Sequence, residues 1–167
     1  MIFVTVGSAV EPFSRLLEAM DNMAPRLGEP VVMQCGRRPY PGKHTRCFGY
    51  ITFGRMQQLV RACRALVGHA ATGPVLMARR CAKPLVIVPR DPAHNELFDD
   101  HQLQTARTTD GRSRMIEVVY DVADLEAAVR RAQAKADRGS TYEPDPERER
   151  LLAALRAAAE GREIPPT

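Results

Sequence analysis

Short apolar runs alternate with stretches of helical periodicity along most of this 167-residue chain, and this alternation constrains its fold more than any other feature. Residues 2–6 form an unbroken run of β-branched and aromatic side chains that ends at Gly7. Residues 85–88 form a second unbroken apolar run, Leu-Val-Ile-Val, flanked by Pro84 and Pro89. Continuous apolar runs of this length are typical of strands that are buried on both faces of a parallel sheet.

Helical segments separate the expected strands, so each strand connects to the next by a crossover of the kind found in parallel βαβ units. We therefore predict an α/β fold, a Rossmann-like open parallel sheet with helices on both faces, in a single domain over residues 1–167. A last helix at about 145–160 begins with Asp145-Pro146, a combination that suits a helix start. The other strands are expected at 31–35, 47–51, 65–68 and 115–119, and the other helices at 12–24, 56–63, 72–82, 98–107 and 125–136.

The composition argues against several classes of function. Aromatic residues make up 5% of the chain, Trp is absent, and the net charge of +4 comes from arginines spread along the chain, so we expect no nucleic-acid partner. The cysteines show no C-x-x-C spacing, which indicates reduced thiols in a cytoplasmic protein rather than a zinc cluster. The apolar N-terminal run is too short for a signal peptide or a membrane span, so we expect a soluble chain.

Two loops that follow predicted strands have the composition of phosphate-binding turns, and in open α/β sheets ligands bind beyond the carboxyl ends of the strands. At Gly7-Ser8, glycine lets the backbone approach a ligand, although a strand-to-helix turn needs glycine for its geometry as well. In the segment G-H-A-A-T-G at 68–73, free amides and the Thr72 hydroxyl could hold a diphosphate. His69 could serve that site or could be tied to local backbone groups.

A third loop, within residues 89–106, is crowded with polar side chains that superficially suggest a metal site. Their spacing matches neither H-x-x-x-H nor H-E-x-x-H, and acids are common at a helix N-terminus, so we expect no metal ligands here. We expect Asp99 and Asp100 to cap or begin the helix, and His101 and Gln102 to face the rim, where neutral groups can hold a sugar. The polar residues of this loop are His94, Glu96, Asp99, Asp100, His101 and Gln102.

The segments MIFVTVGS, PFSRLLEAMD, VVMQCG, ALVGHAATG, KPLVIVPR and DDHQLQTA occur in an order that resembles a known family. The chain is similar to the C-terminal, donor-binding half of MurG-like GT-B glycosyltransferases, which form glycosyltransferase family 28. It most resembles stand-alone half-enzymes, namely the small subunit of the two-part UDP-GlcNAc transferase and the bacterial PssE- and EpsF-like exopolysaccharide proteins. The resemblance spans residues 1 to about 129, and the GHAATG and DDHQ motifs around KPLVIVPR are its specific part.

The resemblance implies a nucleotide-sugar donor, most often UDP-linked, and no cofactor or metal. It implies that the first two loops approach the donor diphosphate, that the H-Q pair faces the donor sugar, and that Arg90 contacts an anion. No catalytic residue or general base is assigned. The donor-binding residues implied in this way are Gly7, Ser8, His69, Thr72, Gly73, Arg90, His101 and Gln102.

Two positions depart from the family pattern. Related loops read H-A-G-T-G, and here Ala71 replaces the middle glycine, which matters if that position needs a positive φ. Many relatives carry an acid for the nucleotide ribose where this chain has Met77, and a thioether cannot replace a carboxylate as the acceptor of a diol. Donor affinity, donor identity and catalytic competence therefore stay open.

A complete GT-B enzyme has two Rossmann-like halves, and this chain has the length of one. The resemblance therefore implies a separate, membrane-anchored, acceptor-binding subunit that brings a lipid-linked sugar, with the present chain at the inner face of the cytoplasmic membrane. The function expected is inverting transfer from a UDP-sugar in polysaccharide biosynthesis. The alternatives are a non-catalytic nucleotide-sugar-binding or scaffold subunit and a metal-dependent hydrolase that uses the polar residues of the third loop. The apolar stripe of the last helix, with Leu151, Leu152 and Leu155, packs either on a partner or on this domain's own sheet.

Overall fold

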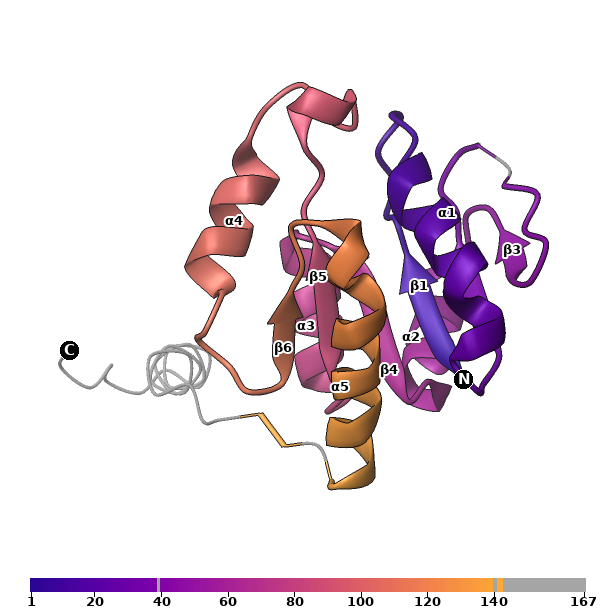
Figure 1. Cartoon of the computed structure of the whole chain (residues 1–167), viewed down its shortest axis with the longest axis vertical. Coiled ribbons are helices and arrows are strands. Elements are labelled where there is room, and N and C mark those ends of the chain that lie inside the picture. The colour runs from indigo at the N-terminus through magenta and orange to yellow at the C-terminus, as the bar shows by residue number, and fades with distance from the viewer. Residues whose placement is uncertain (39, 140, 143–167) are drawn as a thin grey trace, which may run out of the picture.

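The computed structural model describes residues 1–38, 40–139 and 141–142, which form one six-stranded sheet flanked by helices (Figure 1). The strand order is β3-β2-β1-β4-β5-β6, and every neighbouring pair is parallel. The predicted open parallel α/β fold is therefore confirmed. The strands are β1 (Ile2–Thr5), β2 (Val31–Gln34), β3 (Arg46–Phe48), β4 (Ala65–His69), β5 (Leu85–Val88) and β6 (Ile116–Val118).

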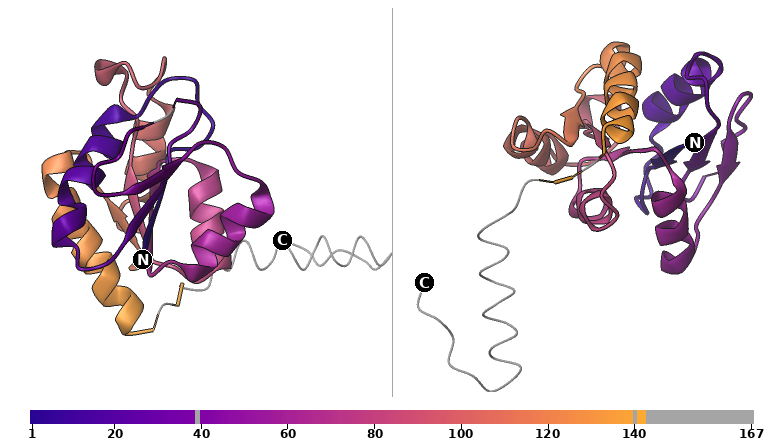
Figure 2. Two further views of the ribbon diagram at one scale, coloured as in Figure 1. Left: turned by 90° about the vertical axis from the view of Figure 1, so that its right-hand side faces the viewer. Right: turned by 90° about the horizontal axis from the view of Figure 1, so that it is seen from below.

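Helices cover both faces of the sheet (Figure 2). One face carries α1 and α5, and the other carries α2, α3 and α4, with α4 beside β6. Short 3-10 turns precede or follow some of these helices. The helices are α1 (Ser14–Met23), α2 (Phe53–Ala62), α3 (Thr72–Arg80), α4 (His101–Thr109) and α5 (Leu125–Asp137), and the 3-10 turns are η1 (Ala24–Arg26), η2 (Pro92–His94) and η3 (Val122–Asp124).

Two hydrophobic cores form because successive side chains of a strand point to opposite faces of the sheet. In β1, Ile2 and Val4 pack in the core under α1 and α5, whereas Phe3 packs in the core under α2 and α3. All residues of β1 and of β5 are buried, as their unbroken apolar runs predict. Both inner strands therefore hold the loops that follow them from within the hydrophobic core.

The structure places the starts of two helices, α2 and α4, about three residues from the positions that the sequence pattern predicts. α4 begins at His101 rather than at residue 98. Its N-cap, Asp100, makes no side-chain capping bond, and a carboxylate oxygen of Asp99 accepts a hydrogen bond from the His101 backbone N–H at 3.2 Å. Phe98, which lies before this cap, is 86% exposed. The last helix expected at about 145–160 lies outside the residues that the structure describes. No helix among those described is both long enough and apolar enough to cross a membrane.

Candidate functional site

The predicted phosphate-binding loops lie next to each other because β1 and β4 are neighbours in the sheet. The chain leaves β1 toward α1 on one face and leaves β4 toward α3 on the other face. Such a reversal of direction is the topological switch point, where open α/β sheets bind ligands. Gly7 and Ser8 follow β1 at this point, and His69 ends β4.

The Gly7 turn is held tightly against His69. Gly7 has a φ of +77°, and a Cβ at this position would lie 2.6 Å from Cε1 of the His69 ring, so only glycine fits. The buried Gln34 side chain donates to the Gly7 carbonyl at 3.1 Å, and the Tyr50 hydroxyl donates to the Ser8 carbonyl at 3.2 Å. Gln34 and Tyr50 were not among the residues predicted from sequence, because the contact from each to this turn depends on how the chain folds.

The His69 imidazole is neutral at physiological pH. Burial, together with the positive charge of Arg90, lowers the pKa of His69 to about 4. Its Nδ1 atom is buried and has no hydrogen-bond partner within the described chain. A neutral imidazole with an unused nitrogen can donate or accept a hydrogen bond without the desolvation cost of a buried charge.

The first turn of α3 presents backbone amides at the same edge of the sheet. Its N-cap residue, Ala71, makes no side-chain capping bond, so the orphan amides of the first turn have no such acceptor. Ala71 has a φ of −137°, an extended conformation that any residue adopts, so this position does not need glycine. Thr72 and Gly73 begin the helix and are exposed. A Cβ on Gly68 would lie 3.2 Å from Pro74. Because Gly68 has no side chain, the start of α3 can pack closely against β4.

A cavity of about 450 Å³ opens between these loops and the helices α2 and α3. Sequence reasoning missed much of its wall, namely Phe53, Met56 and Val60 of α2 and Leu76 and Arg80 of α3. The i, i+3, i+7 spacing of the three α2 residues indicates one helix face, but not that this face borders a ligand site. Met77, noted above for its place in the family pattern, lines the cavity too. Four of the predicted donor-binding residues line it: Gly7, Ser8, His69 and Gly73.

Arg90, which the sequence predicts as an anion contact, is buried among backbone carbonyls. Its side chain is 1% exposed, and Nη1 donates to the carbonyls of Glu11 and Glu96, each at 3.0 Å. Nη2 donates to the carbonyl of Val6 at 3.0 Å, and the guanidinium lies 4.6 Å from the centre of the Phe13 ring. The side chain points into the loop cluster rather than toward solvent, because these inward-facing carbonyl acceptors attract the guanidinium. Arg90 thus joins the loop after β1 to the loop after β5.

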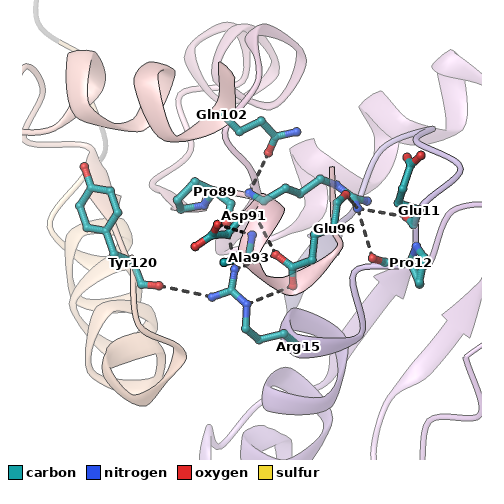
Figure 3. A network of polar contacts seen from close by, with 10 residues as sticks. Glu11, Pro12, Arg15, Pro89, Asp91, Ala93, Glu96, Gln102 and Tyr120 are labelled. Carbon is teal, nitrogen blue, oxygen red and sulfur yellow. Dashed lines mark hydrogen bonds and ion pairs between the residues drawn. The ribbon is translucent and has the colours of Figure 1, made fainter. Parts of the chain in front are cut away.

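A second arginine strengthens the same junction (Figure 3). Arg15 of α1 makes a bidentate ion pair with the buried Glu96, with N–O distances of 3.0 and 2.9 Å. The Arg15 guanidinium also donates to the carbonyls of Pro89 and Tyr120 at 3.0 and 3.3 Å, and Glu96 accepts from the Asp91 amide at 3.1 Å. Glu96 therefore serves as an anchor for the third loop.

The predicted H-Q pair lies outside the cavity. Gln102 accepts a hydrogen bond from the Arg90 backbone N–H at 3.1 Å through its side-chain oxygen. The His101 side chain is 78% exposed, and its Nδ1 lies 2.8 Å from a carboxylate oxygen of Asp99. The structure therefore brings together the residues after β1 and β4 and sets the β5–α4 pair apart from them on the same rim.

The structure shows which partners the polar side chains of the third loop have. Across residues 1–38, 40–139 and 141–142, no three His, Cys, Asp or Glu side chains are grouped so that they could hold a metal ion. The Glu96 carboxylate forms an ion pair with Arg15, and the Asp99 carboxylate accepts a hydrogen bond from the backbone N–H of the first residue of α4.

Comparisons with known proteins agree with this geometry. Residues 1–158 match the model of the glycosyltransferase family 28 C-terminal domain. A curated relative from Eremothecium gossypii, the UDP-N-acetylglucosamine transferase subunit ALG13, is 29% identical over 99 residues, which are 59% of this chain and 47% of that protein. The chain thus spans about half the length of the curated relative that it matches.

Solved structures support the fold. The solution structure of ALG13 aligns with a TM-score of 0.54 and 19% identity, over 90% of this chain and 94% of that one. The forosaminyltransferase SpnP aligns with a TM-score of 0.52 and 14% identity, over 80% of this chain and 35% of that one. Taken with the six-stranded parallel sheet and the cavity at its switch point, the family match shows that the chain belongs to glycosyltransferase family 28 and corresponds to its C-terminal domain.

Proposed function

We propose that this chain is the donor-binding subunit of a two-component inverting glycosyltransferase, which transfers a sugar from a UDP-sugar to a lipid-linked acceptor in polysaccharide biosynthesis. The observation that carries the proposal is the cavity at the β1–β4 switch point, where the Gly7 turn, neutral His69 and the uncapped start of α3 meet. Family membership supports the donor class, and the relative named as a UDP-N-acetylglucosamine transferase subunit supports the two-component arrangement.

In this proposal, the donor diphosphate lies against the amides at Ser8, Thr72 and Gly73. The amides and the positive end of the α3 dipole stabilise the charge that develops on the departing diphosphate, so no metal ion is needed for this step. His69 acts as a neutral hydrogen-bonding group, since a pKa of about 4 leaves it uncharged at pH 7. The mostly apolar part of the cavity, between α2 and α3, takes the nucleoside.

The sugar extends along the rim toward α4. Gln102 uses its side-chain oxygen for Arg90, which leaves its amide N–H groups to donate to sugar hydroxyls. The exposed His101 imidazole is the other candidate contact there. The acceptor and the general base for its hydroxyl come from the partner subunit, which also holds the chain at the inner face of the cytoplasmic membrane.

Calorimetry with UDP and UDP-GlcNAc on the full chain tests donor binding. We expect His69→Ala to weaken UDP binding by about tenfold, the cost of losing one or two buried hydrogen bonds. His94→Ala is the matched control, because His94 is exposed and does not line the cavity. Chelation of divalent metals should leave the affinity unchanged. If neither nucleotide binds, or if both histidine variants weaken binding equally, the donor site is misassigned.

Met77→Glu tests the orientation of the nucleoside. None of the side chains that line the cavity is acidic, and in Rossmann-like sites a carboxylate commonly binds the ribose hydroxyls. Glu at position 77 should therefore tighten UDP binding by about fivefold to tenfold and leave 2′-deoxy-UDP binding nearly unchanged. An equal effect on both nucleotides would show that the ribose does not face this position. Transfer assays with and without the acceptor-binding subunit then separate a catalytic subunit from a non-catalytic one.

A further inference from the structure

The acidic residues of this chain are segregated along the sequence. No Asp or Glu occurs between Glu29 and Asp91, and the same stretch holds eleven Arg and Lys residues. All of the 20 acids therefore lie outside residues 30–90. The arginines are spread along the chain, but the acids are not, so the formal net charge of +4 conceals a strongly positive part of the molecule.

The fold gathers much of this charge on one face. Arg55 and Arg61 of α2 and Arg80 of α3 are exposed, on the side of the sheet that these two helices cover. Arg46 of β3 is exposed as well, and it points to the same side as Phe48, two residues further on, whose ring stacks on Phe3 in the core under α2 and α3.

On the opposite face of the sheet, several arginines are paired with acids. The charges are therefore unevenly distributed in space as well as along the sequence. There, Arg26 and Arg130 pair with Glu126, and Arg131 pairs with Glu117. On the α2–α3 side, no ion pair within the described chain joins Arg46, Arg55, Arg61 or Arg80 to an acid. Arg55 donates one hydrogen bond to the neutral Gln58 side chain at 3.1 Å, but no acid compensates the charge of any of the four guanidinium groups within the described chain, so an external anion can do so.

Large apolar side chains are exposed among these arginines. Phe53 at the start of α2 is 65% exposed, Leu76 of α3 is 54% exposed, and Tyr50 just before α2 is 56% exposed. Exposed aromatic and leucine side chains next to cations, with no acid among them, are typical of surfaces that lie at a lipid–water boundary. We call the seven residues Tyr50, Phe53, Leu76, Arg46, Arg55, Arg61 and Arg80 the cationic face. Three of them, Phe53, Leu76 and Arg80, also line the donor cavity, so the cationic face borders the mouth of that cavity.

We propose that the cationic face docks directly on anionic lipid headgroups. Each exposed cation near an anionic leaflet contributes attraction, while the aromatic and leucine side chains reach the headgroup level. An acidic protein surface would complement the arginines too, but specific protein interfaces set their register with charges of both signs. A fluid anionic lipid surface requires only that the docking protein surface be positively charged. The complete lack of acids from residue 30 to residue 90 matches that requirement.

Co-sedimentation of the full chain with vesicles tests the proposal, in the absence of nucleotide. The probes are phosphatidylcholine vesicles and vesicles with roughly 30% phosphatidylglycerol. We expect binding to the anionic vesicles alone, weakened by salt because the attraction is screened. A chain that stays in the supernatant with anionic vesicles at low salt, or that binds both kinds equally, would overturn the proposal.

Matched charge reversals locate the binding surface. Combined Arg46→Glu, Arg55→Glu and Arg61→Glu should reduce vesicle binding by at least about tenfold. Combined Arg107→Glu, Arg112→Glu and Arg138→Glu changes the net charge equally at exposed positions outside the face, and it should leave most of the binding. Equal losses in the two variants would mean that only net charge matters, and the proposed face would be wrong.

Two further readouts separate this inference from the donor site and from a protein interface. Arg46, Arg55 and Arg61 do not line the cavity, so their variant should bind UDP like the parent chain, which also verifies its fold. Loss of association with the acceptor-binding subunit in lipid-free detergent, with vesicle binding unchanged, would identify the face as a protein interface and overturn the lipid proposal.

Discussion

At the scale of single residues, Gly7 has the strictest requirement for its side chain. Its φ is +77°, and a methyl group there would lie 2.6 Å from the His69 ring. We expect Gly7→Ala to lower the free energy of unfolding by about 2–4 kcal/mol, from backbone strain and the displaced ring together, and to abolish UDP binding. Gly28→Ala is the control, because Gly28 has a φ of +72° but no atom lies within 4 Å of the position that its methyl group would take. Urea denaturation should show a loss of about 1 kcal/mol for Gly28→Ala, and equal losses would mean that the His69 contact is unimportant.

His69 makes stability depend on pH in a defined window. The folded-state pKa of about 4 lies below the unfolded value of about 6.5, so the unfolded chain takes up a proton first as the pH falls. The free energy of unfolding should therefore decrease by up to about 3 kcal/mol between pH 6.5 and pH 4, and His69→Gln should remove this part of the slope. Urea denaturation across that range measures it, with exposed His94→Gln as the control. A slope that both variants share would assign the effect to other groups.

At the scale of elements, Arg90 joins the loops that follow two strands. Its guanidinium donates to carbonyls after β1 and before α4, and its backbone N–H holds Gln102. Arg90→Lys cannot reproduce this planar set of donors, so several buried carbonyls would lose their partner. We expect a loss of about 2–4 kcal/mol in the free energy of unfolding, against less than about 0.5 kcal/mol for exposed Arg38→Lys.

The same variant decides between two roles for Arg90. If Arg90→Lys weakened UDP binding strongly but left the free energy of unfolding unchanged, the anion contact expected from sequence would be right. If stability falls and UDP binding follows it, Arg90 is a positioning residue that acts through the loops.

At the scale of the whole molecule, the strands were predictable and the site only partly so. β5 was predicted to the residue because prolines flank an unbroken apolar run. The starts of α2 and α4 were misplaced by about three residues, because apolar periodicity does not mark the residue at which a helix begins. The Gly7 and GHAATG loops were predicted to share one edge of the sheet, and they do, since β1 and β4 are neighbours. The cavity wall at Phe53 and Leu76 had no comparable signal, because a partly exposed apolar residue on a helix looks the same in sequence wherever the helix lies.

The alternation of strands and helices, the parallel sheet and the glycine turns could be derived from the amino-acid sequence alone, because apolar periodicity and backbone freedom are local properties. Three features depend on tertiary packing instead: the burial of Arg90, the neutral state of His69, and the shared side of the α2 and α3 arginines Arg55, Arg61 and Arg80, which no ion pair joins to an acid among the described residues. Burial and electrostatic environment depend on which distant segments pack together, and those contacts exist only once the strand order is formed.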